Sequence, residues 1–314
     1  MSGIAILHPS NLLGKELTET IENRARQWRE IRLLSTSEEE VGSLTDLAGA
    51  AALVARYEPE SLQGISTVYF CGPIKANRPL FADLPPGATG VVLSPDATPE
   101  DGVPVVAGVN TEAAHPGTVL VSPHPAVVLL AHLLQPLRDL SPESVVATVI
   151  QPASMHDNPG LEELFEQTRS ILSMSGQRPS SIFGTQLAFN LIPTTADALP
   201  LGQTLQRVIG GEDLPVSLQV VQGGVFHSLT VSLYLRLRGN ASAQALRKAF
   251  NGHPYLELVE HPKRLGPIDA AASEKVLFGT IRKDDLGGFW IWAVMDNLTR
   301  GGALNAVEIV EAIQ

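Results

Sequence analysis

The chain contains one cysteine, Cys71, which is the side chain best suited to nucleophilic chemistry. A cysteine attacks as the thiolate, so a neighbouring cation or helix end must lower its pKa. Cys71 follows the apolar run 68–70, and this context favours a small buried hydrophobe instead. A single cysteine also excludes an internal disulfide and a metal site built from several thiolates.

The eight histidines show no spacing typical of a metal site. His124 and His132 lie eight residues apart without an acidic residue nearby, and His115 has no paired carboxylate either. Zinc sites need three or four ligands at characteristic spacings. We therefore expect no bound metal and interpret these histidines as core or surface residues.

The pattern of the first 122 residues predicts the strands and helices that would position reactive side chains. Short runs of mostly apolar, often β-branched residues alternate with segments that can form helices. This alternation favours a doubly wound, mostly parallel sheet covered on both faces. Ser10 is the expected N-cap of the first helix. The expected strands are 4–7, 31–34, 52–55, 67–71, 90–94, 103–107 and 118–122.

The pattern changes after about residue 140. A strand is predicted at 145–151, followed by a helix with Asn158 as its N-cap. Apolar and polar residues alternate over 229–237, which predicts a sheet with one covered face and another that meets water or a partner subunit. The fold class is therefore α/β, a Rossmann-like doubly wound sheet followed by a mixed α+β domain. Further strands are expected at 216–221, 275–281 and 289–294, and a closing helix at 300–313.

Composition and charge narrow the classes of partner. The net charge is −11 over 314 residues, which argues against a nucleic-acid partner because phosphate binding needs clustered Lys and Arg. The longest apolar run, 127–134, is interrupted by His132 and is too short to span a bilayer. The first residues lack the pattern of a signal peptide. We expect a cytoplasmic protein without a membrane partner.

Several segments in register resemble the aspartate-semialdehyde dehydrogenase family. Residues 296–307 read DNLTRGGALNAV, close to that family's DNLxxGAALNAV run. The other matching segments are 5–17, 188–193 (AFNLIP), 267–271 (PIDAA) and 278–282 (FGTIR). The resemblance covers essentially the whole chain. It implies a dinucleotide-binding-type domain at 1–125, onto which a C-terminal helix at 298–314 packs back. It also implies a substrate and dimerisation-type domain at 126–297 that forms a homodimer.

The resemblance also indicates where the family's chemistry would lie. The family forms a thioester on a cysteine of an NPNCST motif, and Pro125 stands at that position here. Gln151 matches the substrate-orienting glutamine and His227 matches the acid-base histidine. Val220 stands where a substrate-binding arginine is expected. Gln151 and His227 are thus remnants of a catalytic set, and His227 is either a catalyst or a structural hydrogen-bond partner.

The cofactor positions implied by the resemblance are similarly altered. The strand-to-helix turn 8–14 keeps one glycine of the family's GxxGxxG, and glycines are what let backbone amides approach a pyrophosphate. The acidic run 38–40 would repel the 2′-phosphate of NADP, so NAD is less disfavoured. We expect no cofactor, with NAD or NADP as the alternative. The family positions for cofactor binding are Ser10, Asn11, Leu12, Leu13, Cys71, Gly72 and Asn297.

Three hypotheses for function remain. The first is a non-catalytic homologue, a pseudoenzyme that acts as a binding, regulatory or assembly protein. It would form a homodimer, and one version adds a heteromeric association with an active homologous dehydrogenase. The second is an NAD(P)-dependent oxidoreductase with altered chemistry on aldehydes. The third is a small-ligand sensor.

Overall fold

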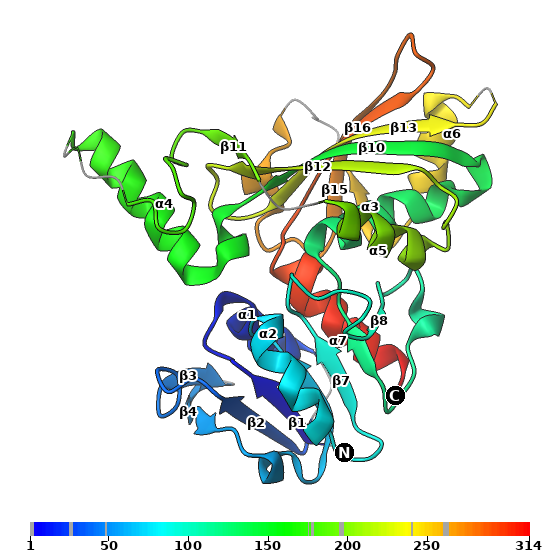
Figure 1. Ribbon diagram of the computed structural model, residues 1–314. Helices are drawn as coiled ribbons and strands as arrows, with labels where there is room; N and C mark the ends of the chain where they lie inside the picture. Colours follow the sequence, from blue (N-terminus) through cyan, green and yellow to red (C-terminus); the bar gives the residue numbers. More distant parts are fainter. Residues whose placement is uncertain are drawn as a thin grey trace. The chain divides into compact units, whose positions relative to one another are not determined.

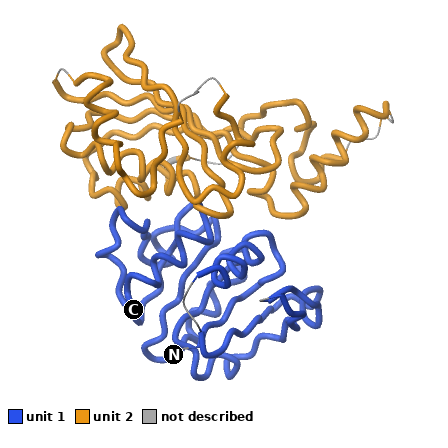
Figure 2. Tube along the Cα trace, turned by 180° about the vertical axis from the view of Figure 1, so that it is seen from behind, with its two compact units in different colours: residues 1–124, 301–314 blue, residues 125–300 orange. Residues whose placement is uncertain are grey.

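The computed structural model describes residues 3–24, 28–47, 49–174, 176, 179–194, 198–239, 241–259 and 264–314. The chain divides into two compact units (Figure 2). Unit 1 comprises residues 1–124 and 301–314, and unit 2 comprises residues 125–300. No helix in the ranges given above is long and apolar enough to cross a membrane.

Unit 1 is built on a parallel sheet in the order β5-β2-β1-β6-β7-β9-β8. All of β1 and β7 is buried, as expected for strands covered on both faces. The predicted Rossmann-like sheet is therefore confirmed. The strands are β1 (Gly3–Leu7), β2 (Glu30–Ser35), β5 (Ala55–Arg56), β6 (Ile65–Phe70), β7 (Thr89–Val92), β8 (Val103–Pro104) and β9 (Val119–Val121), and β3 (Leu44–Leu47) and β4 (Ala50–Leu53) form a separate hairpin.

The helices of unit 1 are α1 (Leu12–Asn23), α2 (Ile74–Asn77) and α7 (Leu304–Ala312). One core cluster joins α1 and α7 to the sheet through side chains that include Ile6, Leu17 and Val307. The C-terminal segment is preceded by a π-helical turn, Thr299–Ala303, so the helix expected from residue 300 begins in regular α form only at Leu304.

Unit 2 contains a mixed sheet in the order β11-β12-β10-β13-β16-β15-β14. The strands β10 and β12 are parallel, whereas β13 runs antiparallel to β10 and to β16. Helices α3, α5 and α6 contact this sheet (Figure 1). The elements are α3 (Pro125–Leu134), β10 (Pro142–Gln151), α4 (Asp157–Leu172), β11 (Leu191–Pro193), α5 (Leu199–Ile209), β12 (Val216–Gly223), β13 (Leu229–Leu237), α6 (Ala243–Phe250), β14 (Leu256–Leu258), β15 (Val276–Lys283) and β16 (Phe289–Met295).

Several local predictions were wrong at the ends of elements. Asn11, not Ser10, caps α1, because its Oδ1 accepts a hydrogen bond from the Gly14 amide at 2.6 Å. Helix α4 begins one residue before Asn158, at Asp157. The strand expected at 52–55 is split between β4 and β5, which belong to different sheets.

Candidate functional site

The turn between β1 and α1 gathers the residues predicted for cofactor binding in unit 1. It starts at His8, whose φ is +57°, and leads into Asn11 at the N-cap. The Asn11 Nδ2 donates a hydrogen bond to the backbone carbonyl of Cys71 at 2.9 Å. The structure thereby brings the segment 10–13 next to Cys71 and Gly72, at the carboxyl ends of β1 and β6.

Glu40 reaches into this turn from the loop that follows β2. Its Oε1 accepts a hydrogen bond from the Ser10 amide at 2.7 Å, and its Oε2 lies 3.1 Å from His8 Nδ1 and 2.5 Å from Ser35 Oγ. The Glu40 side chain is only 13% exposed. Burial acts to raise the pKa of this carboxyl, but the hydrogen bonds from His8, Ser35 and Ser10 outweigh it and lower the pKa to about 2. Glu40 is therefore ionised at neutral pH.

Cys71 directly follows β6 and is 3% exposed. Burial raises the pKa of its thiol strongly, and the negative charge of Glu40 raises it further. A thiol in these surroundings stays protonated at neutral pH, which is the opposite of an activated nucleophile.

In unit 2, one end of the mixed sheet brings together the segments that carry Gln151, His227 and Asn297. Gln151 ends β10, and its carbonyl accepts a hydrogen bond from Gln222 Nε2 at 3.0 Å. Asn297 follows β16, and its buried Oδ1 accepts hydrogen bonds from the Ser228 amide at 3.0 Å and from Ser154 Oγ at 3.2 Å. Asn297 thus joins the loop before β13 to the loop after β10.

The His227 side chain is exposed at this end of the sheet, and in the described part of the chain it has no hydrogen-bond partner. The neighbouring Ser228 is buried with a φ of +71°. An exposed imidazole on a loop of this kind is accessible to solvent and to a ligand. The geometry therefore leaves the acid-base role of His227 open, while giving no support to a role as a structural hydrogen-bond partner.

Sequence reasoning missed two side chains at this end of unit 2. His156 Nε2 lies 3.2 Å from Gln222 Oε1, and the His156 ring packs edge-on against Phe183 with 5.2 Å between ring centroids. His156 follows β10 and Gln222 lies in β12, so their proximity depends on the parallel pairing of these two strands. In unit 1, Glu40 was visible only as part of the acidic run 38–40, and nothing in the sequence indicates that it reaches the turn.

Pro125 is the first residue of α3, a helix whose ten residues are all buried. Proline is favoured at the first helical position, since its φ suits the helix and no backbone donor is needed there. Its side chain has no nucleophilic atom. At this position the structure therefore offers a helix start and no reactive group.

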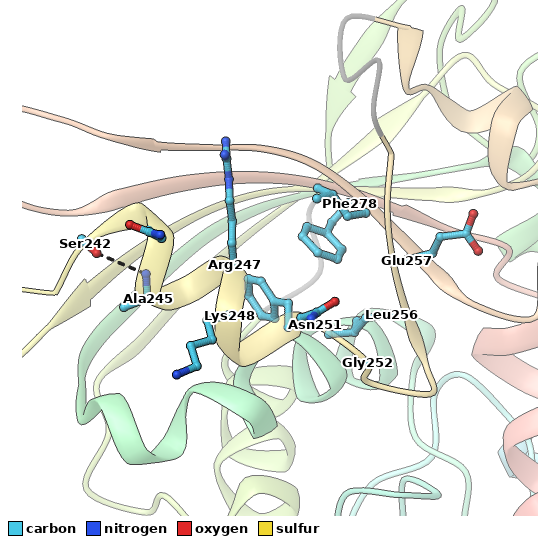
Figure 3. Close-up of a pocket in the computed structure, with 12 residues that line it drawn as sticks. Ser242, Ala245, Arg247, Lys248, Asn251, Gly252, Leu256, Glu257 and Phe278 are labelled. Atoms are coloured by element: carbon cyan, nitrogen blue, oxygen red, sulfur yellow. Dashed lines mark hydrogen bonds between the residues drawn. The ribbon is translucent and has the colours of Figure 1, made fainter.

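A separate cavity of about 760 Å³ lies in unit 2 between α6 and β14 (Figure 3). The rings of Phe250 and Phe278 form its apolar floor, with 4.8 Å between their centroids, and Arg247 and Lys248 lie along its helix. None of the predicted site residues lines it. Across the ranges that the structure describes, no group of three or more His, Cys, Asp or Glu side chains could hold a metal ion.

Comparisons with known proteins agree with this architecture. The family model "Semialdehyde dehydrogenase, dimerisation domain" matches residues 134–300. An aspartate-semialdehyde dehydrogenase of Bacillus subtilis is 24% identical, over 99% of this chain and 97% of the relative. A USG-1 protein homolog of Azotobacter vinelandii is 28% identical over the same shares. The crystal structure of aspartate semialdehyde dehydrogenase II from Vibrio cholerae has the same fold, with a TM-score of 0.89 at 21% identity over 98% of this chain and 97% of that one. The chain belongs to the aspartate-semialdehyde dehydrogenase family.

Proposed function

We propose that this protein is a member of the family that has lost thioester chemistry and acts as a binding, regulatory or assembly protein. The observation that carries this proposal is the state of Cys71. It is the only cysteine in the chain, it is buried, and its thiol pKa is raised. Because a thioester forms from the thiolate, a protonated and enclosed thiol cannot start the reaction at a useful rate.

Pro125, which the resemblance places at the family's nucleophile position, supports the same conclusion. Loss of a covalent nucleophile lowers turnover on the order of a million-fold in enzymes where it has been removed. Cys71 follows β6 in unit 1, whereas Pro125 begins α3 in unit 2.

A homodimer fits the exposed face of the unit 2 sheet. Trp290 and Trp292 in β16 are 37% and 36% exposed, and Val146 in β10 is 48% exposed. Register places Val146, Tyr234 and Trp290 in one row across three neighbouring strands. Exposed aromatic and aliphatic rows of this kind are typical of subunit interfaces. The matched family model is that of a dimerisation domain, which supports homo-oligomerisation.

The same surface would allow a mixed dimer with an active homologue, because homologous subunits present matching faces. Co-expression with differently tagged active dehydrogenase tests this version of the proposal. Mixed dimers should survive two successive affinity steps, and the absence of exchange between purified subunits would exclude them. A cytoplasmic location stays a prediction.

The enzyme assay that tests the loss of chemistry uses aspartate semialdehyde, the substrate named for the relatives, with phosphate and NADP. We expect neither cofactor reduction nor a covalent adduct in the intact mass of the protein. A Cys71→Ser variant is the matched control and should behave identically. Turnover or an adduct that disappears in Cys71→Ser would overturn the proposal.

A second candidate function is an oxidoreductase of altered chemistry, and the names of the relatives favour it. In this version the exposed imidazole of His227 transfers a proton and Gln151 orients the substrate. Turnover on a panel of aldehydes that survives Cys71→Ser but disappears in His227→Ala would establish this function over the first.

A further inference from the structure

A solved aspartate semialdehyde dehydrogenase from Candida albicans holds NADP, and the place where unit 1 would hold a dinucleotide follows from its topology. In an open doubly wound sheet, ligands bind outside the carboxyl ends of the strands at the point where the strand order reverses. Here the chain proceeds from β1 to β2 in one direction and from β6 onward in the other. The switch point therefore lies between the ends of β1 and β6, next to the N-terminus of α1.

Side chains of the turn itself bridge this switch point. The Asn11 amide spans it by its 2.9 Å hydrogen bond to the Cys71 carbonyl. The His8 ring lies directly against Gly72, since a Cβ built on that glycine would be 2.5 Å from His8 Cδ2. An imidazole and a carboxamide thus lie over the ends of the two strands.

Two of the backbone donors of this turn are engaged as well. The Ser10 amide donates to Glu40 at 2.7 Å, and the Gly14 amide donates to the side chain of Asn11 at 2.6 Å. Glu40 is ionised, because its hydrogen bonds hold its pKa far below neutral pH despite burial. An acidic side chain thus already lies at the N-terminus of a twelve-residue helix, where the helix dipole favours an anion.

We infer that Glu40 is a built-in occupant of the anion-binding turn and that, together with His8, it makes unit 1 reject the pyrophosphate of NAD and NADP. The residues at the switch point do not fit a dinucleotide, because its phosphates would have to displace a carboxylate from its donors or lie beside it. This inference deepens the proposed function by naming the residues that exclude the family's cofactor. It does not depend on the chemistry of Cys71.

An acid near the second strand can alternatively accept a hydrogen bond from the ribose 2′-OH of NAD. Glu40 differs from such an acid in its contacts. Both of its oxygens already accept hydrogen bonds from within unit 1, and its side chain is largely enclosed. Separate titrations with NAD and with NADP distinguish the two roles.

The experiment is a calorimetric titration of the full-length protein and three variants with inorganic pyrophosphate, NAD and NADP. Glu40→Ala removes the occupant, and Glu40→Gln removes its charge while keeping its shape. Glu39→Ala is the matched control, because it removes the same charge from the neighbouring exposed residue. We expect no saturation of the wild type or of Glu39→Ala at millimolar ligand. We expect Glu40→Ala to bind pyrophosphate at least tenfold more tightly than the wild type.

Micromolar binding of NAD, NADP or pyrophosphate to the wild type would overturn the inference. Equal affinity of the wild type and of folded Glu40→Ala for pyrophosphate would also overturn it. Thermal unfolding shows whether each variant is folded. If Glu40→Ala is not folded, Glu40→Gln decides: a lower Kd for pyrophosphate than that of the wild type supports the inference, and an equal Kd overturns it. Dinucleotide binding to the wild type without an adduct on Cys71 would refute this inference and leave the proposed loss of thioester chemistry standing.

Discussion

Replacing Asn305 by alanine should destabilise unit 1 far more than a typical polar substitution. Asn305 is fully buried in α7. Its Oδ1 accepts a hydrogen bond from the Ala107 amide at 2.9 Å, and its Nδ2 donates to the Val105 carbonyl at 3.2 Å and to Ser122 Oγ at 2.8 Å. Alanine would leave one buried donor and two buried acceptors without this partner. At about 1 kcal/mol or more for each, the expected loss in the free energy of unfolding is about 3 kcal/mol.

The assay is urea unfolding followed by the fluorescence of Trp28, which packs against the core cluster of unit 1. The chain has three tryptophans, so Phe in place of Trp290 and Trp292 leaves Trp28 as the sole reporter. The control is Asn23→Ala at the exposed end of α1, which should change stability by no more than about 0.5 kcal/mol. A loss below about 1 kcal/mol in Asn305→Ala would refute the reasoning.

Two further changes test close packing, one in unit 1 and one in unit 2. Gly14→Ala should lower the free energy of unfolding by about 2 kcal/mol, because the added Cβ would lie 2.7 Å from the His8 carbonyl oxygen and from Pro9 Cα. Gly202→Ala in α5 should be neutral or stabilising by about 0.5 kcal/mol in thermal unfolding, because the nearest contact of its added Cβ is at 3.6 Å. If both glycines tolerate alanine equally, the turn is looser than described. Burial lowers the pKa of His124 from 6.5 to about 4. The unfolded chain therefore binds a proton that the folded one does not, and stability falls as the pH drops from about 6.5 to 4, by about 3 kcal/mol in all. His124→Gln should remove that part of the pH dependence of the urea midpoint, and an unchanged slope would contradict the assignment.

The strands of the fold were predictable wherever one residue pattern decided the outcome. Alternation over 229–237 gave β13 with both ends correct, because a half-buried strand alternates strictly between two environments. The strand expected at 103–107 is shorter, since β8 ends at Pro104. Beyond it, the Val105 carbonyl and the Ala107 amide are bonded by Asn305, which lies about two hundred residues away in the chain. A local pattern cannot reveal such a distant partner.

The candidate site was likewise predictable from the sequence only in part. Motif reasoning located the turn before α1 and the segments around Gln151 and Asn297, because each of these lies at the end of a predictable strand. It chose Ser10 over Asn11 as the cap, since either residue type can serve. It is the Asn11 side chain that accepts from the Gly14 amide, and the Ser10 amide donates to Glu40. The position of that carboxylate depends on the path of the loop after β2, which has no periodic pattern.

The segment 296–307, which carries the resemblance most strongly, is held by buried hydrogen bonds. Asp296 accepts hydrogen bonds from three backbone amides, those of residues 272, 298 and 299. Asn297 joins two loops of unit 2, and Asn305 joins α7 to the segment 105–107 of unit 1. Each of these side chains is buried, and a change at any one leaves polar backbone groups unpaired at a cost comparable to a large part of the net stability of a domain. A chain can therefore lose a nucleophile and an open cofactor turn while this segment is retained for stability alone. The resemblance predicts the fold for that reason, whereas activity has to be judged at Cys71, His227 and Glu40.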